Sequence, residues 1–169
     1  MVISLAVLIV PILLIGAWFS RIPEPAVNKV DWQPIVAQAR KQARFRVLAP
    51  TNLPDTWIAT RARWTRAGQP GIDDQPAPAD TFALGFLNPE KIYIALDQRA
   101  KPARGYLAQI TRDGRPEGEQ AIGNLTWQRL ISADGRTRAL LLATSDVTTI
   151  VSGDTSYAGL AAFVTTLQG

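Results

Sequence analysis

The sequence predicts an α+β fold in which an N-terminal transmembrane helix precedes one domain, an antiparallel sheet packed by about three helices. Residues 1–19 form an uncharged apolar run, long enough at ~1.5 Å per residue to cross a ~30 Å hydrocarbon core. Short segments with strand or helix periodicity follow it. Consecutive strands joined by two-residue turns must be antiparallel, and three such turns are Gly123-Asn124, Asp134-Gly135 and Ser145-Asp146.

The apolar run, residues 1–20 with its last polar residue, is predicted to be an uncleaved membrane anchor. No Lys or Arg precedes the run, and Trp18 and Phe19 occupy the place where a signal peptide carries small residues. Aromatic residues at the end of a span favour the membrane interface. A signal peptide and a buried helix remain the alternatives. The residues expected to anchor the chain are Val2, Leu5, Leu8, Ile12, Ile15, Trp18 and Phe19.

Composition restricts the chemistry of the domain. The 169 residues carry a net charge of +4 but neither His nor Cys. The chain therefore cannot build Ser–His, Cys–His or zinc sites or disulfides, because each of them needs His or Cys. The basic residues are not clustered beside aromatic ones, so nucleic-acid binding is not expected. We predict no catalytic, cofactor or metal site.

The first part of the domain, predicted to span 31–169, follows an extended proline-containing linker at 21–30. The segment DWQPIVAQARKQA predicts a helix capped by Asp31 and ending near Phe45. The segment TWIATRARW at 56–64 alternates as a strand with one partly polar face. Residues 66–80 contain three prolines and two glycines, which indicates a long, mobile loop.

Two further strands, TFALGFL and KIYIALD, surround a turn at Asn88-Pro89-Glu90. A second helix is expected to begin at Pro102, where the missing N–H is harmless, and to stop at Asp113-Gly114.

A meander of four strands should follow, with LLLAT central because it is apolar on both faces. Asp154 or Thr155 is expected to cap a final helix. The predicted strands of the meander are 120–122, 125–131, 137–144 and 147–152.

Two groups of basic residues are candidate binding sites. Arg40, Lys41 and Arg44 lie about 20 residues after the predicted anchor and could contact anionic headgroups or a partner. A second group could hold an anion at the start of the second helix: it consists of Arg99, Lys101 and Arg104.

The carboxylates are scattered, and their only close pairs lie in segments predicted to be solvated loops. Asp73-Asp74 and the pair Glu117 and Glu119 therefore do not predict a catalytic acid and base. A calcium site using Asp73, Asp74 and Asp80 would lack the regular spacing of an EF-hand loop.

In this order, the apolar run, the segment DWQPIVAQAR, the segment LPDTWIATRARW and the ending TTIVSGDTSYAGLAAFVTTL resemble an uncharacterised actinobacterial family of single-pass membrane proteins, a domain of unknown function. Members typically carry a basic stretch before the apolar run. This chain lacks one, so we expect the native start to lie upstream. The resemblance implies a plasma-membrane protein with an extracytoplasmic domain. A literal count of Arg21 and Lys29 after the run favours a cytoplasmic one.

We therefore expect a membrane-tethered, non-enzymatic interaction module. It would be an accessory or assembly subunit of an actinobacterial envelope or respiratory membrane complex, with the lipid bilayer and other membrane proteins as its partners. The alternative is a binding domain for an envelope lipid or glycan. An enzyme using carboxylates, Lys or Tyr would need two such groups with shifted pKa values in one cleft.

Overall fold

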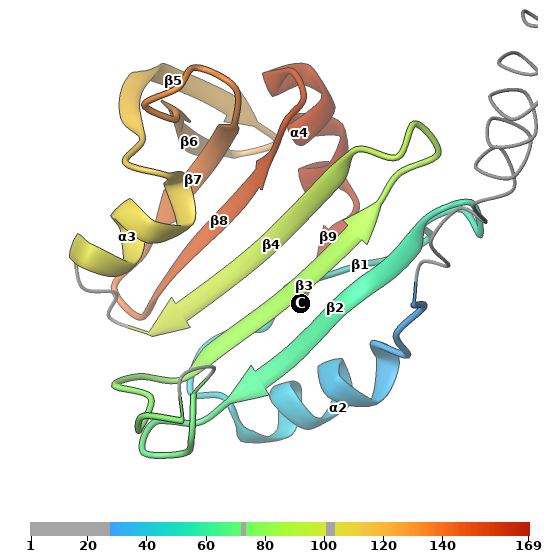
Figure 1. Ribbon diagram of the computed structural model, residues 1–169, viewed down its shortest axis with the longest axis vertical. Helices are drawn as coiled ribbons and strands as arrows, with labels where there is room; N and C mark the ends of the chain where they lie inside the picture. The colour runs from blue at the N-terminus through green and yellow to red at the C-terminus, as the bar shows by residue number, and fades with distance from the viewer. Residues whose placement is uncertain (1–27, 72–73, 101–103) are drawn as a thin grey trace, which may run out of the picture.

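The computed structural model describes residues 28–71, 74–100 and 104–169. In them a seven-stranded antiparallel sheet has the order β2-β3-β4-β8-β7-β6-β5, and a small second sheet pairs β1 with β9 (Figure 1). The described elements are α2 (Gln33–Gln42), β1 (Ala49–Pro50), β2 (Ile58–Thr65), β3 (Thr81–Leu87), β4 (Tyr93–Ala100), α3 (Arg104–Thr111), β5 (Arg115–Ile122), β6 (Leu125–Ile131), β7 (Arg138–Ala143), β8 (Val147–Gly153), α4 (Tyr157–Thr165) and β9 (Leu167–Gln168).

The predicted α+β class of the domain is wrong. The described residues form a mostly β structure of nine strands, with three helices of only eight to ten residues. None of the helices in this part of the chain has the length and apolarity needed to cross a membrane. The predicted anchor at 1–20 and most of the linker at 21–30 lie outside the described residues.

The two faces of the large sheet are covered unequally. On one face α2 and α4 pack over the main core, which includes Val36 and Ala39 of α2, Phe82 of β3 and Leu160 and Phe163 of α4. On the other face the short α3 covers a smaller cluster around Leu130 and Ile150. Figure 1 shows α3 lying in front of β8 and β7 and leaving the front of β2, β3 and β4 without a helix.

Strand β8 is the true centre of the sheet, because it lies between β4 and β7. Every residue of β8 is buried, although its sequence VTTIVSG is less apolar than LLLAT. The prediction that LLLAT would be central is therefore off by one strand. The other strand positions of the meander are confirmed, with β5 beginning earlier than expected, at Arg115.

The helix boundaries shift slightly from the predicted ones. Trp32 rather than Asp31 occupies the N-cap of α2, but the Asp31 carboxylate still accepts a hydrogen bond from the N–H of Gln33 at 3.2 Å. At α4 the cap is Ser156, whose side chain accepts from the N–H of Gly159 at 3.1 Å, and neither Asp154 nor Thr155. Both helices thus begin within two residues of the expected caps.

The segment before β1 is fixed to the sheet by one buried amide. The Gln98 side chain accepts from the N–H of Leu48 at 2.8 Å and donates to the carbonyl of Arg46 at 3.2 Å. It also donates to the hydroxyl of Thr149 at 3.0 Å. Gln98 is fully buried, and these bonds satisfy its polar atoms there.

Candidate functional site

The uncovered front of β2, β3 and β4 forms a trough because of its cross-strand register. Residues directly opposite one another on paired strands share a face of the sheet. The middle strand, β3, presents only small side chains there, whereas each neighbouring strand presents two charged ones. The three rows across β2, β3 and β4 are Arg61–Gly85–Ala95, Arg63–Ala83–Asp97 and Thr65–Thr81–Arg99.

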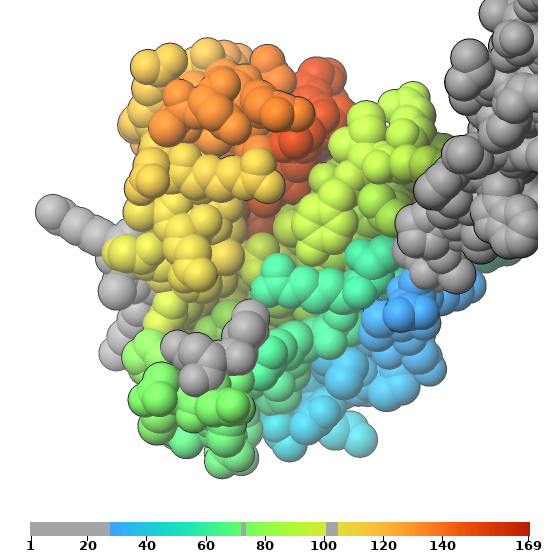
Figure 2. Space-filling view, viewed as in Figure 1, coloured from blue at the N-terminus to red at the C-terminus, as the bar shows by residue number. Residues whose placement is uncertain are grey.

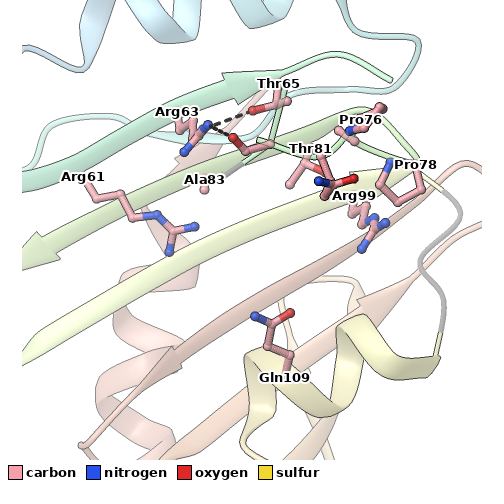
Figure 3. A pocket seen from close by; sticks show the side chains of 12 residues that line it. Arg61, Arg63, Thr65, Pro76, Pro78, Thr81, Ala83, Arg99 and Gln109 are labelled. Atoms are coloured by element: carbon pink, nitrogen blue, oxygen red, sulfur yellow. Dashed lines mark hydrogen bonds between the residues drawn. The ribbon is translucent and has the colours of Figure 1, made fainter. Parts of the chain in front are cut away.

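Two cavities, of about 310 Å³ and about 640 Å³, lie on this face and have Arg61 and Gln109 as common walls. We call them together the groove. Figure 2 shows this face hollowed between the yellow side chains of α3 and the green ones of the β2–β3 region. In Figure 3, Arg61 of β2, Arg99 of β4 and Gln109 of α3 surround the smaller cavity from three different elements.

Arg61 and Asp97 form an ion pair in the groove. Arg61 donates from Nη2 to Asp97 Oδ1 over 3.3 Å, and the side-chain exposures are 36 % for Arg61 and 2 % for Asp97. Burial raises the pKa of Asp97 to about 6, while the charge of Arg61 opposes that shift. Burial lowers the pKa of Arg61, but Asp97 raises it, and the net direction is upward. In this pair the guanidinium of Arg61 stays partly exposed to solvent, whereas the carboxylate of Asp97 is buried.

Arg63 is held in position by two hydrogen bonds. Its Nη2 donates to the carbonyl of Gly71 at 2.8 Å, and its Nε donates to the Thr65 hydroxyl at 3.3 Å (Figure 3). The acceptor Gly71 belongs to the loop at 66–80. This loop folds back on itself through Gly68 N–H to Ala77 O at 2.8 Å.

Arg99 stacks on the ring of Tyr106 from α3, with its Cζ 4.4 Å from the ring centroid. Such a stack is a cation–π contact. Arg99 Nε and Tyr106 Oη are buried and have no hydrogen-bond partner within the described residues. Burial, with Asp97 nearby, raises the pKa of Tyr106 well above its ordinary value. Within the described part of the chain, two polar atoms beside the groove therefore have no partner, which is rare for buried groups in native proteins.

The groove is electropositive. Among the described residues, three arginines and no carboxylate line the smaller cavity. The larger cavity adds Lys91 and Arg112 to Arg61, against Asp97 and Asp154. In a recess with low-dielectric walls, charges of one sign raise the local concentration of oppositely charged ligands. The arrangement is suited to holding an anion.

The basic residues predicted from the sequence lie elsewhere or in part outside the described chain. Arg40, Lys41 and Arg44 are exposed in and just after the last turn of α2, which packs on the opposite face of the sheet from the groove. Arg40 donates to the carbonyl of Gln168 at 3.0 Å. Their predicted contact with headgroups or a partner stays a prediction.

The predicted anion site at the start of the second helix is only partly visible. Arg99 belongs to β4 and reaches the groove, whereas Lys101 lies outside the described residues. The seven anchor residues also lie outside them.

Among the described residues, the acidic candidates do not come together. Asp80 accepts from the N–H of Ala67 at 2.8 Å, and Asp73 lies outside the described residues. Glu117 accepts from the Tyr157 hydroxyl at 2.8 Å, away from the groove on β5. Over the described ranges, no three acidic side chains gather where they could hold a metal ion.

Sequence reasoning missed Arg61, Arg63 and Asp97 as parts of one site. The signal available was the partly polar face of TWIATRARW. That signal placed two arginines on one side of a strand but named no opposing residue. The register with β3 and β4 supplies the missing information.

Comparison with known proteins gives a family but no activity. Residues 1–167 match a family described as "Protein of unknown function (DUF4245)". No curated protein matches the chain.

Proposed function

The chain belongs to the DUF4245 family of proteins of unknown function, and we propose that it is a non-enzymatic binding domain that works at a membrane and holds an anionic ligand in the groove. The observation that carries this proposal is the convergence of Arg61, Arg63 and Arg99 on one cavity. Guanidinium groups make strong, often bidentate hydrogen bonds to carboxylates and phosphates. The small residues of β3 leave room for a carboxylate or phosphate between these three arginines.

The burial of Asp97 and its ion pair with Arg61 favour a binding function over a catalytic one. General acid–base chemistry needs a proton-transferring group within hydrogen-bond reach of the substrate. The Asp97 carboxyl is 2 % exposed and paired with Arg61, so it acts on the orientation and charge of Arg61. Tyr106 Oη is likewise buried. We infer that both groups shape the groove and that neither attacks a bound molecule.

Membrane attachment is proposed from the sequence. The uncharged apolar run at 1–19 would hold the domain at the plasma membrane, on the extracytoplasmic side that the family resemblance implies. An accessory subunit of an actinobacterial envelope or respiratory complex is the competing proposal. A protein contact surface of that kind is commonly apolar at its core. Only Tyr93 and Leu125 are exposed large apolar side chains among the described residues, and this favours the ligand-binding proposal.

The test is purification of the tagged full-length protein from its own membranes in mild detergent, followed by native mass spectrometry. We expect the wild type to retain a small anionic molecule, and the double variant R63A/R99A to lose it. The matched control is R136A, which removes one positive charge in the turn between β6 and β7. Recovery of a stoichiometric protein complex that R63A/R99A leaves unchanged would contradict the proposal and favour the accessory-subunit function.

A further inference from the structure

We infer that the anion held in the groove is a phosphate monoester. This inference rests on the proposed function and names its ligand class. The first argument is charge: Arg61, Arg63 and Arg99 with Asp97 give the site a formal charge of about +2 at neutral pH. A phosphate monoester carries about −1.5 to −2 and matches that charge without a counter-ion.

The second argument is the number of directions from which donors approach. Arg61 and Arg63 stand on β2, Arg99 stands across β3 on β4, and Gln109 comes from α3 (Figure 3). A planar carboxylate has two oxygens, which one or two guanidinium groups satisfy. A monoester has three terminal oxygens that diverge in space. It can therefore accept hydrogen bonds from β2, β4 and α3 together.

The third argument is that two of the arginines are held in position before a ligand binds. Arg99 stacks on the ring of Tyr106 and lines the smaller cavity. Arg63 is already fixed by Gly71 and Thr65. A bound phosphate can accept hydrogen bonds from both guanidinium groups. Arg63 would meet the phosphate without losing side-chain freedom, because its position is set before binding.

The ester group of the ligand has a place in the larger cavity. That cavity, of about 640 Å³, adjoins the phosphate site through Arg61 and Gln109 and includes Ile92, Tyr93 and Ile110 in its walls. It offers both apolar and polar contacts to an organic group. The phosphate can belong to a soluble ester or to a lipid headgroup, and the experiment separates these two sources.

The test is isothermal titration of the full-length protein in detergent micelles with glycerol phosphate, with succinate as a dicarboxylate control. We expect glycerol phosphate to bind, R99A and R63A to weaken it at least about tenfold, and R136A to leave it unchanged. R99K keeps the charge but lacks the planar guanidinium, and we expect it to weaken binding at least about tenfold as well. Thermal melting of each variant establishes that it is folded.

The source is identified by the same titration in micelles with short-chain phosphatidate, or with short-chain phosphatidylglycerol as the diester control. Arg99-dependent binding of phosphatidate supports a lipid monoester. Arg99-dependent binding of glycerol phosphate alone supports a soluble one. Equal or tighter Arg99-dependent binding of succinate would overturn the phosphate inference and leave the proposed function standing. Binding of every anion unaffected by R63A and R99A would overturn both.

Discussion

Arg61 of β2 reaches across β3 to pair with Asp97 of β4, with 3.3 Å between Nη2 and Oδ1. The two side chains are not directly opposite each other, because Asp97 lies in the row of Arg63. The diagonal contact places the carboxylate of Asp97 next to the cavity that Arg61, Arg63 and Arg99 line. It therefore sets the charge of the groove, and its titration links stability and binding to pH.

Replacing Asp97 by Asn should alter the pH dependence of stability. The pKa of Asp97 rises from 3.8 to about 6 in the folded protein. The folded state therefore holds this proton more tightly than the unfolded state does. The resulting stabilisation is complete below pH 4 and is lost as the pH rises towards 6.

Relative to wild type, D97N should gain on the order of 2 kcal/mol of unfolding free energy between pH 4 and pH 7. Urea unfolding of both proteins at several pH values measures this difference. A constant difference at all pH values would show that Asp97 keeps an ordinary pKa.

Acidification should tighten anion binding in the groove. As the pH falls through about 6, Asp97 becomes neutral and Arg61 loses its competing partner. Sulfate is a suitable probe because its charge does not change in this range. We expect its affinity to rise about fivefold between pH 7 and pH 5, which corresponds to the loss of about 1 kcal/mol of Coulomb repulsion between Asp97 and the anion. D97N should bind sulfate tightly at both pH values, and a pH effect of the same size in D97N would contradict this account.

Two glycines of the sheet should respond differently to substitution by Ala. A Cβ at Gly85 would collide with the outer ring atoms of Tyr93, which is 40 % exposed and can turn away. A Cβ at Gly153 would lie 2.8 Å from the backbone carbonyl of Tyr93, which is fixed by the pairing of Ile94 with Gly153.

We expect G153A to cost about 1–3 kcal/mol of unfolding free energy, and G85A to cost less than about 1 kcal/mol. Chemical denaturation of the two variants compares them directly. The reverse order would show that Tyr93 is held rigidly over Gly85.

The buried amide of Gln98 should be hard to replace. Q98L keeps much of the volume but leaves the N–H of Leu48 and the carbonyl of Arg46 without their partner. Each unsatisfied buried group costs about 1–3 kcal/mol, so we expect a loss of about 2–6 kcal/mol for the two groups. Q109L, in the wall of the groove, is the matched control and should leave stability nearly unchanged. Hydrogen exchange at Leu48 should also accelerate in Q98L alone.

Much of the sheet can be predicted from the sequence because its strands are joined locally. Alternating apolar residues and the pairs Gly123-Asn124 and Asp134-Gly135 identify the strands of the meander and their antiparallel pairing. The balance of helix and strand was misjudged because the helices are short. The sequence predicts β7 as the central strand, whereas β8 occupies the centre, and this difference has a clear cause. The Thr-rich β8 is buried by its neighbours on both edges and both faces, which its own composition does not show.

The groove was less predictable, because its residues meet only through long-range register. Arg63 and Asp97 lie in one row because β2 and β4 each pair with β3. Sequence spacing alone does not fix that register. The loop at 66–80 supplies Gly71 to Arg63, and a segment rich in Pro and Gly carries little signal for such a contact.

The placement of β8 between β4 and β7 also has a consequence for biosynthesis. Strands β2, β3 and β4 can pair as hairpins while the ribosome is still at work, but the inner edge of β4, at Tyr93–Ala100, waits for Val147–Gly153 to emerge. At about 5–20 residues per second, the interval is roughly 2–10 s. During that time an open strand edge with apolar residues is exposed to other nascent chains, and such edges template aggregation. Chaperone demand during translation should therefore be highest over this stretch.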